Sequence, residues 1–149
     1  MFQASGWLNR RIILFCSVAI LATVCGCGKS PEPWEIVHPA RGTVTYKGKP
    51  IAGAELSFFP QDSTYPDSVR PRAKSADDGS FVVWTYAEGD GAPAGKYKVT
   101  IVHHEVSISK EAVVAKPNDL PAKYSRLDST DLEVSIGETE TEIPPLELH

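Results

Sequence analysis

Residues 95–101 read Gly95-Lys96-Tyr97-Lys98-Val99-Thr100-Ile101, and from Lys96 onward polar and apolar side chains alternate strictly. Successive side chains of a β-strand point to opposite faces of the sheet, so a period of two places Tyr97, Val99 and Ile101 on one face. The other face then carries lysine and threonine. This stretch predicts a strand with one buried face, and it sets the fold class for the rest of the chain.

The same period of two recurs through most of the sequence. It appears at residues 42–46, 54–58, 80–86, 106–108, 132–136 and 141–148. Turn residues separate these runs, and no segment after residue 27 carries a convincing helical stripe, with Pro121 to Tyr124 forming a single turn at most. About seven short strands with frequent turns predict an all-β sandwich.

Two turns and one proline pair refine this expectation. Lys47 to Pro50 predicts a first turn, and Asp77-Asp78-Gly79 predicts a hairpin, because glycine readily adopts the positive φ that such turns require. Pro144-Pro145 interrupts the last candidate strand, which therefore belongs at a sheet edge.

The N-terminal segment has the pattern of an export signal. Arg10 and Arg11 precede an apolar run from Ile12 to Val24, and small residues surround Cys27. A run of 13 residues is too short for hydrocarbon ~30 Å thick, which makes a transmembrane anchor the weaker alternative. The cysteine at the cut resembles the bacterial lipobox, which implies cleavage before Cys27 and a lipid, such as palmitate, on it.

This interpretation divides the chain into three parts. We expect a signal peptide over residues 1–26, a lipidated proline-rich tether over 27–39, and a sandwich domain over 40–149. The departure from the usual lipobox is Cys25, two places before Cys27, which leaves the position of the cut open. Prolines in the tether favour an extended, semi-rigid spacer. With Gly28 after Cys27, the sequence resembles lipoproteins that are not retained at the inner membrane. We therefore expect an extracytoplasmic protein that is attached to the outer membrane rather than the inner one.

Charge and cysteine content exclude several classes of function. Without Arg10 and Arg11, 13 of the 15 basic residues remain against 19 acidic ones, a net charge of −6 over 123 residues. Such an acidic domain argues against nucleic acid as a partner, because phosphates require clustered lysine and arginine. Cys16 and Cys25 leave with the signal and Cys27 takes the lipid, so the domain keeps no thiol for a disulfide or a metal site. The acidic domain also offers no polybasic patch for anionic lipid, so we expect the N-terminal lipid alone to carry the affinity for the membrane.

A family resemblance spans nearly all of the expected domain, from Arg41 to Leu148. The motifs that carry it are Gly42-Thr43-Val44, Gly48-Lys49-Pro50-Ile51, Gly53-Ala54, Asp77-Asp78-Gly79-Ser80-Phe81 and Ala94-Gly95-Lys96-Tyr97-Lys98-Val99. In this order they resemble the carboxypeptidase regulatory-like domain, a transthyretin-like (prealbumin-like) or immunoglobulin-like β-sandwich. Residues 120–124 and 132–137 are similar to the tail of short bacterial lipoproteins with this domain. The resemblance implies an accessory module that is mostly non-catalytic.

The sequence contains no pattern that indicates a catalytic residue, a metal site or a cofactor. Adjacent strand residues point to opposite faces, so His103 and His104 cannot readily share a metal ion. The aspartates fit turns better than a calcium loop; they are Asp62, Asp67, Asp77, Asp78 and Asp90. Glu138, Glu140 and Glu142 suit a solvated edge strand. No Gly-x-Ser-x-Gly elbow is present, and the C-terminal signature of the transthyretin-related hydrolase is missing, so we expect a non-enzyme.

Two aromatic residues are the candidates for ligand binding. Trp84 and Tyr86 have the opposite parity to Phe81 and Val83 on the expected strand, which predicts an exposed aromatic pair. Such a pair can stack on sugar rings or contact a protein, but the favoured interpretation is that loop 61–72 or the tether covers Trp84. The resulting hypothesis is a lipid-anchored binding or structural module of the cell envelope with a protein partner. A polysaccharide ligand and a divergent hydrolase remain the alternatives.

Overall fold

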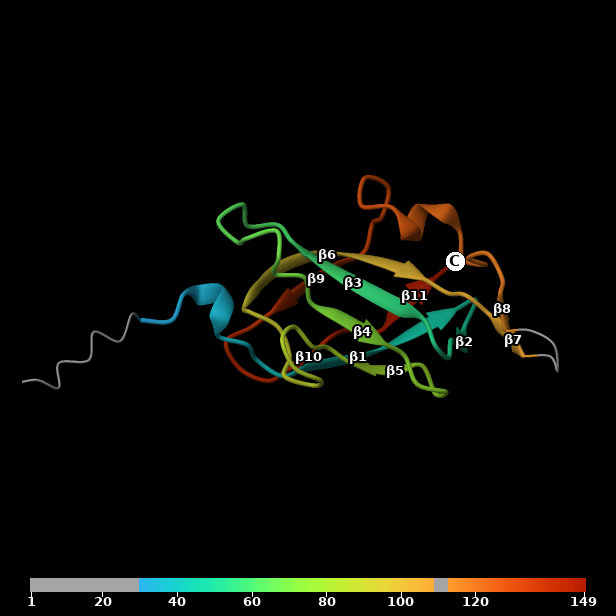
Figure 1. The fold of residues 1–149 in the computed structure, drawn as a ribbon, viewed down its shortest axis with the longest axis horizontal. Helices are drawn as coiled ribbons and strands as arrows, with labels where there is room; N and C mark the ends of the chain where they lie inside the picture. Colours follow the sequence, from blue (N-terminus) through green and yellow to red (C-terminus); the bar gives the residue numbers. More distant parts are fainter. Residues whose placement is uncertain (1–29, 109–112) are drawn as a thin grey trace, which may run out of the picture. The chain divides into compact units, whose positions relative to one another are not determined.

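Nearly all of the regular structure is β-strand (Figure 1). The computed structural model describes residues 30–108 and 113–149, so the expected signal peptide and Cys27 lie outside the described residues. The strands are β1 (Ala40–Tyr46), β2 (Lys49–Pro50), β3 (Glu55–Pro60), β4 (Arg72–Lys74), β5 (Ser80–Val82), β6 (Gly95–Val102), β7 (Val106–Ile108), β8 (Val113–Ala115), β9 (Glu133–Ile136), β10 (Thr141–Glu142) and β11 (Leu146–Leu148). Two short 3-10 turns accompany them, η1 (Pro33–Glu35) and η2 (Ala122–Ser125). No helix in the described part of the chain is long and apolar enough to cross a membrane.

Two sheets form the sandwich, which confirms the predicted fold class. In the first sheet β1 is central, pairing parallel with β10 and β11 and antiparallel with β2 and β5. The second sheet is antiparallel, in the order β4-β3-β6-β9. The described sandwich thus has nine strands, against about seven expected, partly because Pro144-Pro145 splits the last run into β10 and β11. Both segments pair only with β1, so the predicted edge position is confirmed.

The turn at Asp77-Asp78-Gly79 does not join a simple hairpin. Gly79 adopts φ +78°, and the amide of Ala76 donates to the carbonyl of Ser80 at 2.7 Å, as a tight turn requires. However, β4 pairs with β3 in one sheet and β5 pairs with β1 in the other. The predicted hairpin is confirmed at its turn and again where Arg72 and Trp84 pair antiparallel, but β4 and β5 between these points do not pair with each other and belong to different sheets.

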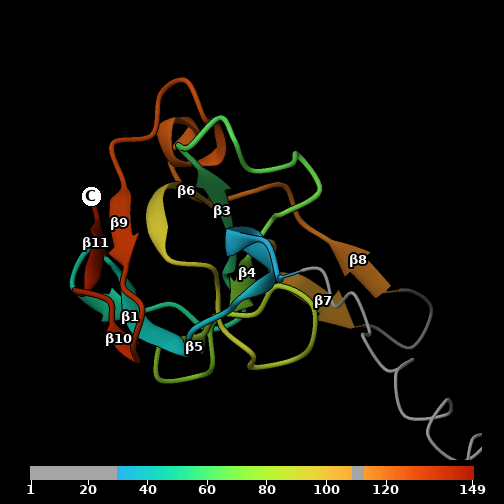
Figure 2. The same ribbon diagram turned by 90° about the vertical axis from the view of Figure 1, so that its left-hand side faces the viewer.

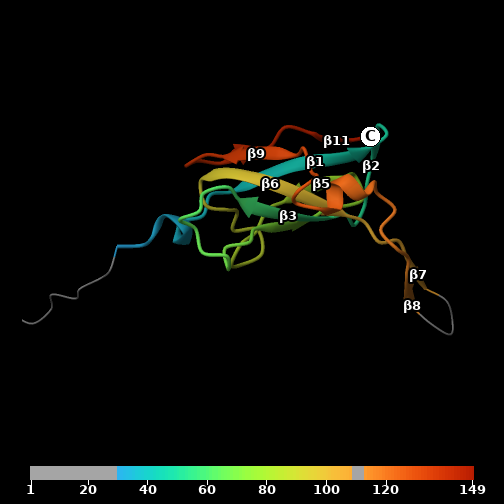
Figure 3. The same cartoon turned by 90° about the horizontal axis from the view of Figure 1, so that it is seen from above.

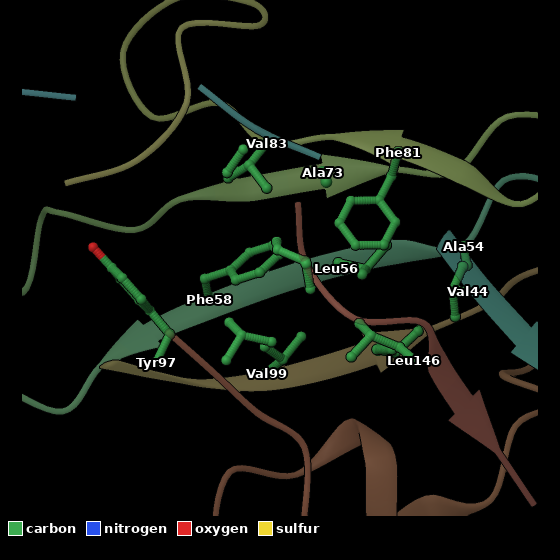
Figure 4. Packing of buried hydrophobic residues seen from close by; sticks show 14 of the residues in the cluster. Val44, Ala54, Leu56, Phe58, Ala73, Phe81, Val83, Tyr97, Val99 and Leu146 are labelled. Carbon is green, nitrogen blue, oxygen red and sulfur yellow. The ribbon is translucent and has the colours of Figure 1, made fainter. Parts of the chain in front are cut away.

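The core confirms the face predicted from the alternating pattern. Tyr97, Val99 and Ile101 are completely buried between the sheets. Phe58 of β3 lies between two other rings, with centroid distances of 6.4 Å to both Phe81 and Tyr97 (Figure 4). Burial of such rings is the main source of stability in a domain without disulfides.

The two ends of the sandwich carry different structures. Figures 1 and 3 place η1 at one end and the β7–β8 pair at the other. Figure 2 looks at the end with η1, beside the loops at residues 61–69 and 87–93. We call these the tether end and the hairpin end.

Candidate functional site

Trp84 lies just beyond β5 and is fixed by Arg72. The two residues exchange both backbone hydrogen bonds, each 2.9 Å long. The Arg72 guanidinium lies 4.0 Å from the centroid of the Trp84 ring, a cation–π contact on one of its faces. The ring is half-buried and held in one orientation, so it is preorganised for contact with a ligand.

A hollow of about 400 Å³ opens beside this ring, which we call the Trp84 hollow. It is lined by Lys74, Ala76, Ser80, Phe81, Val82, Trp84, Glu88 and Gly89. Its volume is within the range of small-molecule sites, and it combines an apolar floor with an ammonium, a carboxylate and a hydroxyl group. Lys74 and Glu88 form no salt bridge within the described chain, so both charged groups are open to a ligand.

Tyr86 belongs to the tether end and not to the Trp84 hollow. Its side chain is 55% exposed, and its hydroxyl donates to the backbone carbonyl of Trp34 at 2.5 Å. The Trp34 ring meets Tyr65 edge-on at a centroid distance of 6.2 Å, and the Tyr65 hydroxyl donates to the carbonyl of Ala94 at 2.7 Å. Burial raises the pKa of both phenols, so they remain protonated donors at neutral pH.

The structure therefore does not unite the two aromatic candidates. No ring contact joins Trp84 to Tyr86 among the described residues. The regular strand ends at Val82, and the following loop folds around Asp90, whose carboxylate accepts from the amides of Thr85, Tyr86 and Ala87 at 2.7–3.0 Å. Parity along a strand cannot be extended across such a loop, which is why the predicted pair is divided between two locations.

The tether itself is bound to the sandwich. His38 and Ala92 exchange backbone hydrogen bonds of 2.8 and 3.0 Å. At Gly91, with φ +96°, a Cβ atom would lie 1.9 Å from the carbonyl oxygen of His38, so only glycine permits this approach. The sequence predicts a spacer, and in the structure Trp34 and His38 of this segment are bound to the sandwich, whereas Glu35 and Ile36 between them are exposed.

The two histidines occupy the hairpin end with separate partners. His103 Nδ1 lies 2.8 Å from Asp119 Oδ1, whereas His104 Nδ1 lies 3.0 Å from the carbonyl oxygen of Lys116. In the described part of the chain, no three His, Cys, Asp or Glu residues are grouped to hold a metal ion.

Several of the acidic residues considered in the sequence have local partners. Asp62 accepts from the amide and hydroxyl of Thr64, and Asp78 from those of Ser80; these hydrogen bonds lower the pKa of each carboxyl. Arg41 pairs with Glu140 and Glu142 at 2.9 and 2.8 Å. These carboxylates are explained by turns and by a surface ion-pair network.

Sequence reasoning missed a second concave region, on the outer face of the second sheet. Two hollows of about 370 and 400 Å³ share Phe59, Pro60, Gln61 and Leu127. The adjacent pair Phe58-Phe59 could have indicated this region, because neighbouring strand residues point to opposite faces and one of the two rings must face outward. The outward ring is Phe59, and the Arg70 guanidinium lies 4.2 Å from its centroid.

No family model and no curated protein matches the chain. Among solved structures, it is similar to a 9R-lipoxygenase from Cyanothece PCC8801, at 15% identity and a TM-score of 0.40. That likeness covers 96% of this chain and 21% of the lipoxygenase, so the chain spans about a fifth of that protein. A second likeness is to a protein from Pseudomonas aeruginosa for which carbohydrate binding has been suggested, at 9% identity and a TM-score of 0.39, covering 77% of this chain and 92% of that one. At such TM-scores neither likeness assigns a function.

Proposed function

We propose that this chain is a lipid-anchored, non-catalytic binding module on the extracytoplasmic side of a bacterial envelope. The lipobox-like sequence at Cys27 supports the anchor, and the resemblance to the carboxypeptidase regulatory-like domain supports the accessory role. The partner is an envelope protein or an envelope polysaccharide. The outer membrane is the favoured location because Gly28 follows the cysteine.

The observation that carries this proposal is the docked tether. Hydrogen bonds from Tyr86 to Trp34 and between His38 and Ala92 fix the segment that follows the expected anchor. A free spacer gives a domain a wide search volume, whereas a docked one holds it close to its attachment point. Such docking suits a module that works at the membrane to which it is attached.

The anchor is tested by metabolic labelling with an alkyne analogue of palmitate in a bacterial host. We expect label in the wild-type protein and in Cys25→Ser, and none in Cys27→Ser. The matched cysteine variant controls for loss of a thiol within the signal. Label that persists in Cys27→Ser, or that is absent from the wild type, would overturn the lipid anchor.

Saccharide binding at the Trp84 hollow is the second candidate function. Sugars present apolar C–H faces to aromatic rings and hydroxyl groups to polar side chains, and this hollow offers Trp84 together with Lys74 and Glu88. The second aromatic candidate, Tyr86, uses its hydroxyl at the tether end.

Pull-down on purified envelope polysaccharides separates the two aromatic residues. We expect Trp84→Ala to weaken binding about three- to tenfold, and Tyr86→Ala to leave it nearly unchanged. Circular dichroism checks that both variants are folded. Equal binding by the wild type and a folded Trp84→Ala variant would exclude the hollow as the sugar site.

A further inference from the structure

The tether end presents an unusual group of exposed and half-exposed amphipathic side chains. Ile36 is 46% exposed and Tyr86 is 55% exposed; the Tyr86 hydroxyl donates to the Trp34 carbonyl, and the Trp34 ring contacts that of Tyr65. Tryptophan and tyrosine combine an apolar ring with a polar group, and they are enriched where a protein meets the membrane–water interface. We call Trp34, Ile36, Tyr65 and Tyr86 the tether-end cluster.

The length of chain before the cluster limits its distance from the proposed lipid. Trp34 is seven positions after Cys27, and an extended chain advances at most ~3.6 Å per position, so their separation cannot exceed ~25 Å. The headgroup layer of one leaflet is itself about 5–8 Å thick. A lipid on Cys27 therefore keeps Trp34 within ~25 Å of the lipidated residue, which is short enough for the cluster to reach the headgroup layer.

The docked tether converts this proximity into a preferred orientation. Trp34 and His38 are hydrogen-bonded to the sandwich, so the domain cannot rotate freely about residues 34–38. Figures 1 and 3 place the hairpin end at the side of the sandwich opposite to η1.

The charge around the cluster selects the type of lipid. Glu35 and Asp90 lie close enough to Tyr86 for their negative charges to oppose its ionisation, in addition to the effect of burial. Carboxylates at this end repel a surface rich in anionic lipid and tolerate a zwitterionic one.

From this arrangement we propose that the tether-end cluster rests in the headgroup region of a zwitterionic bilayer, so that the hairpin end projects away from the membrane. The inference depends on the proposed lipid anchor. It adds to that function a membrane-contact surface and a fixed direction for the domain, with β7–β8 exposed to partners beyond the bilayer.

Tryptophan quenching tests the orientation, because cleavage at the expected site removes Trp7 and leaves only Trp34 and Trp84. The full lipidated protein is reconstituted into phosphatidylcholine vesicles whose acyl chains are brominated near the headgroup. Three single-tryptophan forms are compared: Trp84→Phe, which reports Trp34; Trp34→Phe, which reports Trp84; and Lys49→Trp with both native tryptophans changed to Phe. Lys49 is an exposed residue of β2, which lies toward the hairpin end in Figures 1 and 3.

We expect Trp34 to be quenched at least about twofold more than Trp84, and the tryptophan at position 49 to be unquenched. Replacing part of the phosphatidylcholine by phosphatidylglycerol should reduce quenching of Trp34. Flotation of the vesicles reports anchoring separately. Protein that floats while Trp34 is quenched no more than position 49, or equally in anionic vesicles, overturns this inference and leaves the proposed anchor intact; protein that does not float overturns the anchor itself.

Discussion

The tether end and the hairpin end are held together by different kinds of interaction. At the tether end, neutral phenols donate to backbone carbonyls, as Tyr97 does to Pro93 and Tyr65 to Ala94, both at 2.7 Å. At the hairpin end, the base of β7–β8 is closed by the exposed ion pair of Lys116 with Glu105 at 2.5 Å and by a contact of 2.8 Å between His103 Nδ1 and Asp119 Oδ1. Hydrogen bonds inside a low-dielectric core are costly to lose, whereas exposed ion pairs contribute little. The difference indicates an end built to stay fixed and an end with a low cost of local opening.

The largest effect is expected where the tether meets the loop. Gly91→Ala places a Cβ atom against the carbonyl of His38 at a positive φ, so the free energy of unfolding should fall by about 3 kcal/mol. Gly89→Ala is the matched control, because Gly89 also has positive φ but open space around it, and only about 1 kcal/mol is expected. Urea unfolding measures both. Equal losses would mean that the docked tether contributes no stability.

Tyr97→Phe tests the buried phenol of the same end. Loss of its hydrogen bond to Pro93 should cost about 1–2 kcal/mol at neutral pH. Burial raises the pKa of Tyr97, so its neutral form stabilises the fold fully below the unfolded value of about 10, and this contribution is lost as pH rises above it. Urea midpoints across that alkaline range should fall less steeply in Tyr97→Phe than in the wild type. Parallel curves would contradict this account.

Asp90→Ala tests the loop that follows β5. Three backbone amides lose their shared carboxylate, and the free energy of unfolding should fall by about 1–2 kcal/mol. Trp34 emission should shift as well, since Tyr86 lies in this loop and holds the Trp34 carbonyl. Asp67→Ala, at an exposed loop aspartate, is the control and should be near neutral. An unchanged Asp90→Ala variant would show that the loop does not need this carboxylate.

The smallest effect belongs to the hairpin end. Glu105→Gln removes the ion pair with Lys116, and global stability should change by less than about 0.5 kcal/mol. Amide exchange should nevertheless accelerate at Lys116, whose amide donates to the Glu105 carbonyl at 2.9 Å. High salt should produce the same acceleration in the wild type by screening the pair. If Glu105→Gln lowered the free energy of unfolding as much as Gly91→Ala, the proposed difference between the two ends would be contradicted.

The predictions from sequence are confirmed for features that depend only on residues close together in the chain. Alternation along residues 95–101 and 54–58 identifies the buried faces, because a strand needs only its own period to sort polar from apolar side chains. Pro144-Pro145 marks an edge, since proline cannot donate to a second neighbour. The candidate site is less predictable, because the hollow beside Trp84 combines residues of β4, β5 and the loop at Glu88.

The amino-acid sequence alone predicts an all-β sandwich and the buried faces of its strands, and it supports the hypothesis of an exported, lipidated chain. Contacts in the folded structure place β4 and β5 in different sheets, pair β10 and β11 parallel to β1, and put Trp84 and Tyr86 at separate locations. These outcomes depend on contacts between residues far apart in the chain. Arg72 fixes one aromatic residue and Trp34 the other, and neither partner can be identified from a period of two.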